Sequence, residues 1–294
     1  MSIIILYGGK IKAANSEKNA RGIYLDYADK NLQGKVRFCN VDSDGNIFES
    51  KIKTDIHKIL SHSDTLIDTT HDYIGRGTHH ELARNLGLKI LFANDLDTDN
   101  FRKIIFQIGI NHPEYNIIQK EDKNIRSTLY DMWRTMHMPI ILKASKKSIP
   151  NLLTYNYQEA FEHINTSHAI GDDIILDSHI KGKRYTVVAL KNYRGEELYM
   201  TPIVETFDNI DNKNGYRKYI SANFLSQTEK DIIQNEARKI SDHILENLVK
   251  IDFVLDKNKN LKLVNASIKP DYHDGKIMHS VFKDYGINIS DILN

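Results

Sequence analysis

This chain of 294 residues has one cysteine, no long apolar run and almost no net charge. Cys39 cannot form an internal disulfide, and its place in the apolar stretch 36–41 favours a small core residue over a nucleophile. The 40 basic and 39 acidic residues leave a formal net charge of +1. We therefore have no electrostatic reason to expect nucleic acid or a membrane surface as the main partner.

No apolar run approaches the roughly 18 residues of a membrane span, and the stretch 2–7 is too short for the core of a signal peptide. We therefore expect a cytoplasmic protein with no membrane partner. Internal repeats and low-complexity linkers are also missing from the sequence. What is present, 40% hydrophobic and 27% charged residues, suits a protein with a large core divided into two or three lobes.

The first hundred residues alternate between expected strands and expected helices. Continuous apolar runs at 2–7, 36–41, 64–68 and 89–92 are typical of buried strands, and helical stretches lie between them. This order predicts a doubly wound parallel sheet. A loop at the carboxyl end of such a strand faces the ligand crevice. His71, in the loop after 64–68, is therefore either a site residue or a hydrogen-bonding residue that only fixes the turn.

The stretch 250–270 predicts a β-hairpin. Two apolar, β-branched runs, 251–255 and 261–264, flank a polar Asp-Lys-Asn-Lys-Asn turn. Side chains alternate between the two faces of a strand, so the side chains of Asp252 and Phe253 point to opposite faces of the first strand. Asn265 and Ser267 share one face of the second strand. These polar groups could meet in one cleft.

This hairpin resembles the carboxy-terminal signature of the ATP-grasp ligases, most closely that of the D-alanine-D-alanine ligases. In that family an Asp, a Glu thirteen positions later and an Asn two positions beyond hold the magnesium ions that bridge ATP phosphates. The same spacing falls here on Asp252, Asn265 and Ser267, with Lys250 in place of the family's Arg. The resemblance implies ATP and Mg²⁺ as cofactors, with Asp252 and Asn265 as metal ligands. Because magnesium prefers carboxylate oxygens, the loss of two of the three ligands predicts a weakened metal site.

The resemblance extends to the expected nucleotide site. Lys143 ends an apolar strand, as does the family's phosphate-binding lysine. The segment 177–187 is similar to the family's adenine-hinge segment, which implies that Asp177, His179 and Ile180 contact the nucleotide. In contrast, the family's glycine-rich phosphate loop corresponds to 144–153, which contains no glycine. Without glycine a cradle of backbone N–H groups is not expected, so the phosphate site is predicted to be weakened.

Three further residues match family positions near the reacting groups. The resemblance implies catalytic roles for His71, for Lys218 in the segment 216–219 and for Ser280 before the last helix. Over nearly the whole chain it implies an α/β ATP-grasp fold of three α/β lobes, at 1–93 (an N-terminal Rossmann-like domain), 94–178 (the small ATP-grasp lobe) and 179–294 (the C-terminal lobe).

The implied function is that of a divergent ATP-dependent carboxylate-amine ligase acting on an amino acid or a similar small molecule. The alternative is a catalytically inactive relative, a pseudoenzyme that binds a ligand or a partner, and a purely structural protein is a third hypothesis. Ligases of this kind are often dimers, which leaves a homodimer open.

Overall fold

The computed structural model describes residues 2–10, 13–28, 36–70, 73–92, 98–145, 149–207, 218–244, 246–268, 271–273 and 276–292. The chain divides into two compact units. Unit 1 comprises Met1–Asp97, Arg184–Asp252 and Asn265–Asn294, and unit 2 comprises Thr98–Lys183 and Phe253–Val264. The three lobes expected at 1–93, 94–178 and 179–294 stay a prediction.

The amino-terminal part of unit 1 is a six-stranded sheet in the order β4-β3-β2-β1-β5-β6. Its parallel strands are β1 (Ile3–Gly8), β2 (Val36–Val41), β5 (Thr65–Asp68) and β6 (Lys89–Leu91), and its antiparallel edge is β3 (Ile47–Glu49) with β4 (Ile52–Thr54). The helices are α1 (Ala13–Ala28), α2 (Ile56–Leu60) and α3 (Arg76–Asn85).

The strand β1 explains why this part of the sequence is so apolar. Ile3 and Ile5 belong to one hydrophobic core, whereas Ile4 and Leu6 belong to another. Since alternate side chains point to opposite faces, both faces of the parallel sheet are buried, as a doubly wound sheet requires. At its end Gly8 has a φ of +102°, and a Cβ there would lie 2.4 Å from a backbone oxygen of β2, so only glycine fits this turn.

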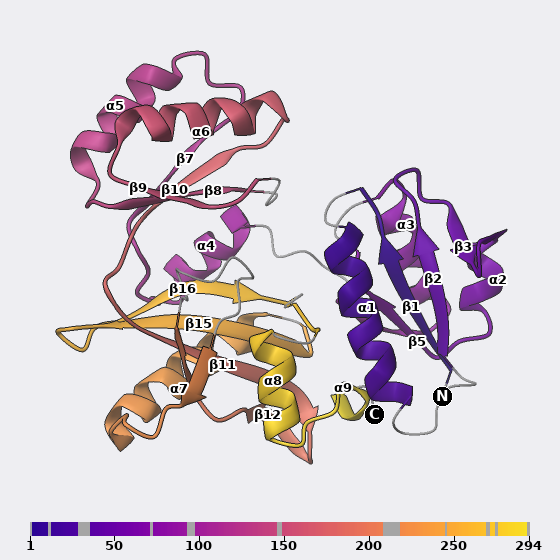
Figure 1. Ribbon diagram of the computed structural model, residues 1–294. Coiled ribbons are helices and arrows are strands. Elements are labelled where there is room, and N and C mark those ends of the chain that lie inside the picture. Colours follow the sequence, from indigo (N-terminus) through magenta and orange to yellow (C-terminus); the bar gives the residue numbers. More distant parts are fainter. Residues whose placement is uncertain are drawn as a thin grey trace. The chain divides into compact units, whose positions relative to one another are not determined.

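Unit 2 contains an antiparallel four-stranded sheet in the order β7-β10-β8-β9. The strands are β7 (Tyr115–Ile118), β8 (Ile140–Ala144), β9 (Leu152–Thr154) and β10 (Ile174–Ser178). The helices of this unit are α4 (Thr98–Gln107), α5 (Ile125–Thr135) and α6 (Tyr157–Ala169). Helices α5 and α6 pack on this sheet (Figure 1).

The third sheet has the order β14-β13-β11-β15-β16, and β12 also pairs with β11. Its strands are β11 (Gly182–Tyr193), β12 (Glu196–Met200), β13 (Val204–Phe207), β14 (Lys218–Ser221), β15 (Leu248–Asp256) and β16 (Leu261–Ser267). The helix α7 (Gln227–His243) lies between β14 and β15 in the chain, and α8 (Ile277–Asp284) and α9 (Ile289–Ile292) follow β16. The predicted hairpin is therefore present as β15 and β16. In its turn the Asp256 carboxylate accepts the backbone N–H groups of Asn258 and Asn260 at 2.8 and 2.9 Å.

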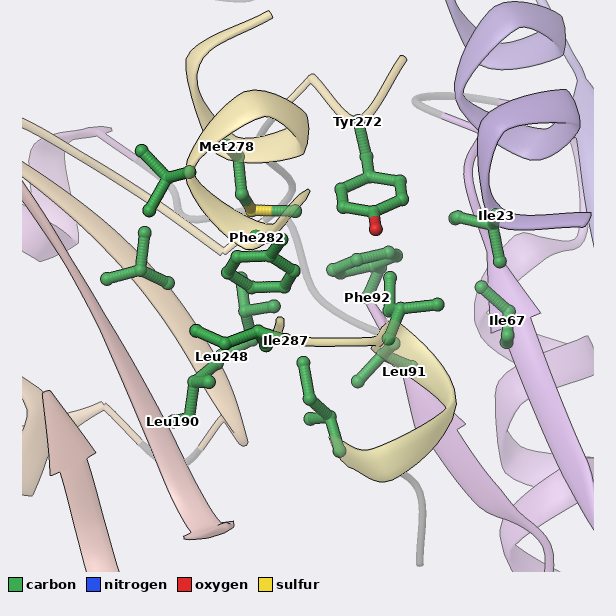
Figure 2. Close-up of a cluster of buried hydrophobic side chains, with 14 of the residues drawn as sticks. Ile23, Ile67, Leu91, Phe92, Leu190, Leu248, Tyr272, Met278, Phe282 and Ile287 are labelled. Atoms are coloured by element: carbon green, nitrogen blue, oxygen red, sulfur yellow. The ribbon is translucent and has the colours of Figure 1, made fainter. Parts of the chain in front are cut away.

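Unit 1 owes its compactness to a core built from both ends of the chain, which Figure 2 shows. Tyr272 stacks edge-on against Phe282 of α8, with ring centroids 5.7 Å apart. The Tyr272 hydroxyl donates a hydrogen bond to the Asp26 carboxylate, and its backbone N–H donates to Asn19 Oδ1 at 2.8 Å. The carboxy-terminal residues thus bury their apolar surface against α1 and the first sheet, which places distant parts of the sequence in one unit.

None of the helices described by the structure is long and apolar enough to cross a membrane.

Candidate functional site

Two cations converge on a buried aspartate in unit 2. Asp177, near the end of β10, is 2% exposed. Its Oδ2 lies 2.5 Å from Lys143 Nζ of β8, and its Oδ1 lies 2.6 Å from a terminal nitrogen of Arg102 on α4. The strand register pairs Lys143 with Ile175, two residues before Asp177, so the two side chains are diagonal neighbours on one face of the sheet. The sequence-predicted residues Lys143 and Asp177 are thus brought together.

The charges of this cluster explain why Asp177 can be buried. An unpaired carboxylate inside a protein is strongly unfavourable, and pairing with cations offsets that cost. The Arg102 guanidinium is itself held over the Tyr115 ring, 4.0 Å from its centroid. One lysine, one arginine and one aspartate leave a formal charge of +1, and the Lys143 side chain is 26% exposed. A phosphate oxygen is a suitable ligand for such a group.

The two other expected nucleotide contacts follow Asp177 directly in the chain. The backbone N–H of His179 donates to the Pro139 carbonyl at 2.9 Å, which continues the pairing of β10 with β8. His179 and Ile180 are both half-buried. Their backbone is therefore held next to the Lys143–Asp177 pair.

In unit 1 the predicted metal ligands lie within a network centred on Asp252 of β15. Its Oδ2 accepts hydrogen bonds from Lys250 Nζ at 2.5 Å and Asn265 Nδ2 at 3.1 Å, and its Oδ1 accepts one from Thr186 Oγ1 at 2.5 Å. Burial alone would raise the pKa of Asp252. The positive charge of Lys250 and the hydrogen bonds from Lys250, Thr186 and Asn265 outweigh this effect and lower the pKa to about 2.

This network does not fit a pair of magnesium ions. Both oxygens of Asp252 already accept hydrogen bonds, one of them from an ammonium group. Two unit charges 4 Å apart interact by about 4 kcal/mol at an effective dielectric constant near 20, so an ammonium and a divalent ion at that distance repel by roughly twice as much. In the part of the chain that the structure describes, no group of three or more His, Cys, Asp or Glu residues is arranged to hold a metal ion.

Of the three predicted catalytic residues, the structure describes the backbone of Lys218 and all of Ser280. His71 lies outside the described residues. The backbone of Lys218 begins β14 and pairs with Phe207 of β13. Ser280 lies in α8, half-buried, and its N–H donates to the Lys276 carbonyl at 3.0 Å. Among the described hydrogen bonds, none joins Ser280 to Asp252, so a shared site for these residues stays a prediction.

The structure adds a buried polar cluster that the sequence did not predict. Asp68, at the end of β5, is fully buried. Its Oδ2 lies 2.8 Å from Arg76 Nε and 2.7 Å from His80 Nε2, and its Oδ1 accepts the backbone N–H and the hydroxyl of Thr70 at 2.8 and 2.5 Å. Burial raises the pKa of Asp68, but the hydrogen bond from His80 and the charge of Arg76 outweigh it, and the pKa is lowered.

A sequence signal for this cluster exists. Arg76 and His80 are four residues apart on one helix, so they lie on the same helical face. Asp68 ends a strand of a parallel sheet, the edge at which such sheets bind ligands.

The fold and these clusters define the class of the protein. Three sheets, of which the first is parallel and carries an antiparallel edge, together with a carboxy-terminal hairpin that bears Asp252, form an α/β protein with the ATP-grasp fold. Residues 104–294 match the family model described as D-ala D-ala ligase C-terminus, which covers more than half of the chain. The chain belongs to the D-Ala-D-Ala ligase family. The resemblance inferred from the hairpin and the hinge segment is thereby confirmed.

Solved structures agree on the fold. D-alanyl-alanine synthetase A from Vibrio cholerae matches with a TM-score of 0.77 and 15% identity over 100% of this chain and 96% of its own. The VanG D-Ala:D-Ser ligase from Enterococcus faecalis matches with a TM-score of 0.73 and 13% identity, over 99% of this chain and 97% of its own. The D-alanine-D-alanine ligase from Bacillus anthracis, solved in complex with ATP, matches with a TM-score of 0.70 and 15% identity, over 99% of this chain and 94% of its own. A comparison with curated protein sequences finds no match.

Proposed function

We propose that the chain is a divergent ATP-dependent carboxylate-amine ligase of the D-Ala-D-Ala ligase type, with weakened metal and phosphate sites. One observation carries this proposal: Lys143 and Arg102 converge on the buried Asp177 and leave a formal charge of +1 in unit 2. Membership of the family supports a nucleotide as the ligand, as does the Bacillus anthracis ligase that was solved with ATP.

In this proposal Lys143 and Arg102 bind phosphate oxygens, because ammonium and guanidinium groups donate charge-assisted hydrogen bonds to phosphate. Asp177 holds both cations in place before the nucleotide binds. The segment at His179 and Ile180 contacts the adenine.

ATP supplies the phosphoryl group that activates a carboxylate for attack by an amine. The substrates are amino acids or similar small molecules, and His71, Lys218 and Ser280 are the candidates for contacts with them. No step through magnesium is proposed, since the network at Asp252 does not fit the ion.

Calorimetry with ATP tests the nucleotide site. The Lys143→Met substitution keeps the aliphatic stem and removes the charge, so we expect ATP affinity to fall about tenfold or more. Lys120→Met is the matched control, because Lys120 is an exposed lysine of the same unit that pairs only loosely with Glu121, at 3.7 Å. Equal losses in both variants, or no loss in Lys143→Met, would contradict the assignment.

Release of ADP tests the ligase reaction. The wild-type protein is incubated with ATP and a panel of amino acids that includes D-alanine, alone and in pairs. We expect at least one amino acid to stimulate ADP release, and stimulation should disappear in Lys143→Met. A panel without any stimulation contradicts the ligase reaction but leaves nucleotide binding intact.

A catalytically inactive relative, a pseudoenzyme, is the second candidate, and the Lys250–Asp252 ion pair favours it. A metal site whose carboxylate is neutralised by a lysine lacks the charge that magnesium needs beside ATP phosphates. This candidate predicts that ATP binds without turnover under every substrate condition, and ADP release above background refutes it.

The assembly and the location are part of the same proposal. A ligase that consumes ATP and joins amino acids is expected in the cytoplasm, and a homodimer is the expected assembly. Light scattering should give twice the mass of the chain, and the mass of one chain at micromolar concentration contradicts the dimer.

A further inference from the structure

The strand β15 places an ammonium group against the carboxylate of Asp252, one of the predicted metal ligands. Lys250 and Asp252 are two positions apart on one strand, so their side chains project from the same face. Lys250 Nζ lies 2.5 Å from Asp252 Oδ2, the separation of a strong charge-assisted hydrogen bond. The neighbouring strands add Asn265 Nδ2 on the same oxygen and Thr186 Oγ1 on the other.

The surroundings keep this ion pair together. The side chains of Lys250 and Asp252 are only 13% and 3% exposed, so the ammonium cannot move away without leaving a buried carboxylate unpaired. An incoming divalent ion would have to displace a cation that the protein supplies itself. It would also meet no net negative charge at this position, because the formal charges of Lys250 and Asp252 cancel.

We propose that Lys250 replaces the metal ion as the resident cation of this hairpin, so that this protein binds nucleotide phosphates without a divalent metal. An ammonium group has three N–H donors, and among the described contacts Lys250 uses one of them, on Asp252. The others are available to a phosphate oxygen. The exclusion of metal rests on the contacts alone, whereas the metal-free binding of nucleotide rests on the proposed function.

A titration with Mn²⁺, followed by the electron paramagnetic resonance of the free ion, tests the exclusion of metal. The wild-type protein should bind no Mn²⁺ that depends on Asp252. Lys250→Met uncovers the carboxylate and should gain Mn²⁺ affinity by about tenfold or more, and the double variant with Asp252→Asn should lose that gain. Lys239→Met is the matched control, because it removes an exposed lysine that pairs with Glu236 on α7.

Two outcomes overturn the exclusion of metal. One is a wild-type Mn²⁺ site that Asp252→Asn abolishes, which needs no Lys250 variant and so stands even where Lys250→Met fails to fold. The other is a folded Lys250→Met, checked by circular dichroism, that gains no Mn²⁺ site.

Calorimetry of wild-type protein with ATP, in magnesium and in EDTA, tests the metal-free binding of nucleotide. We expect the two affinities to agree within about threefold. A loss of about tenfold or more in EDTA overturns the proposal. If ATP binds in neither buffer, the proposed function fails, and metal-free nucleotide binding falls with it. The Mn²⁺ titration still decides separately whether Lys250 excludes the metal.

Discussion

The free energy of unfolding should fall in acid as Asp252 becomes protonated, and the size of this fall follows from the lowered pKa of the carboxyl group. The pKa of this carboxyl is lowered from 3.8 to about 2 in the folded protein. A depressed pKa stabilises the fold above the unfolded value, near pH 4, and this contribution is lost as the pH falls through the folded value, near pH 2. At 1.36 kcal/mol per pKa unit, the ionised group contributes about 2 kcal/mol at neutral pH, most of which disappears between pH 5 and pH 2.

Urea unfolding of wild type and Asp252→Asn at pH 5, 4, 3 and 2 measures this contribution. At pH 5 the substitution leaves the Lys250 ammonium without its counter-charge and should cost about 3 kcal/mol. The difference between the two proteins should shrink by about 2 kcal/mol at pH 2, because wild-type Asp252 is then largely protonated in the unfolded protein and half protonated in the folded one. Other carboxylates titrate in both proteins and cancel in the difference.

A difference that stays constant from pH 5 to pH 2 would refute the reasoning, because it would mean that Asp252 is not held as a carboxylate by its neighbours. Thr186→Val provides an independent check. It removes one hydrogen bond to Oδ1, so it should cost about 1 kcal/mol at pH 5 and should shift the acid loss of stability to higher pH.

Four further substitutions, one of them a control, test the packing of unit 1 by thermal or urea unfolding. Arg76→Met leaves the buried Asp68 carboxylate without its arginine partner and should cost about 3 kcal/mol. A loss below about 1 kcal/mol would contradict the burial of that pair. Gly8→Ala introduces a Cβ 2.4 Å from a strand carbonyl at a φ of +102° and should cost about 2 kcal/mol or more, whereas Gly77→Ala, in a helix with open space around it, should stabilise by about 0.5–1 kcal/mol; equal effects at both glycines would contradict this. Phe282→Ala removes a fully buried ring from the core shown in Figure 2 and should cost about 3–5 kcal/mol, and a loss within about 1 kcal/mol would show that the ring is not packed as described.

The sequence predicted the fold where one local pattern is sufficient. The apolar run of β1 indicated a strand buried on both faces, and the polar turn between two β-branched runs indicated the β15–β16 hairpin; both are present. The antiparallel edge of β3 and β4 was not predicted, because each is a strand of three residues and their side chains are mostly half-buried or exposed. Such short strands form by pairing with a neighbour, which a local pattern does not reveal.

The site shows a similar division. The resemblance to the ligase family was enough to select Lys143, Asp177 and Asp252, and Lys143 and Asp177 are in contact. The sequence also showed that a lysine stands two positions before Asp252, but not that the two form a buried ion pair. That pairing depends on how far each side chain is removed from solvent and on Thr186, which lies 66 residues away in the chain. Long-range hydrogen bonds of this kind leave no periodic trace in the sequence.

Each of the three sheets contains one buried aspartate held by a basic side chain, and the exposure of those cations differs. The basic partners of Asp68 and Asp252, Arg76 and Lys250, are 14% and 13% exposed, while Lys143 beside Asp177 is 26% exposed. An anion reaches a cation only through solvent-accessible surface. Among the described ion pairs, Asp177 has two cationic partners and Asp252 has one. Lys143 is therefore the most accessible of these three cations, and its substitution should weaken the binding of ATP.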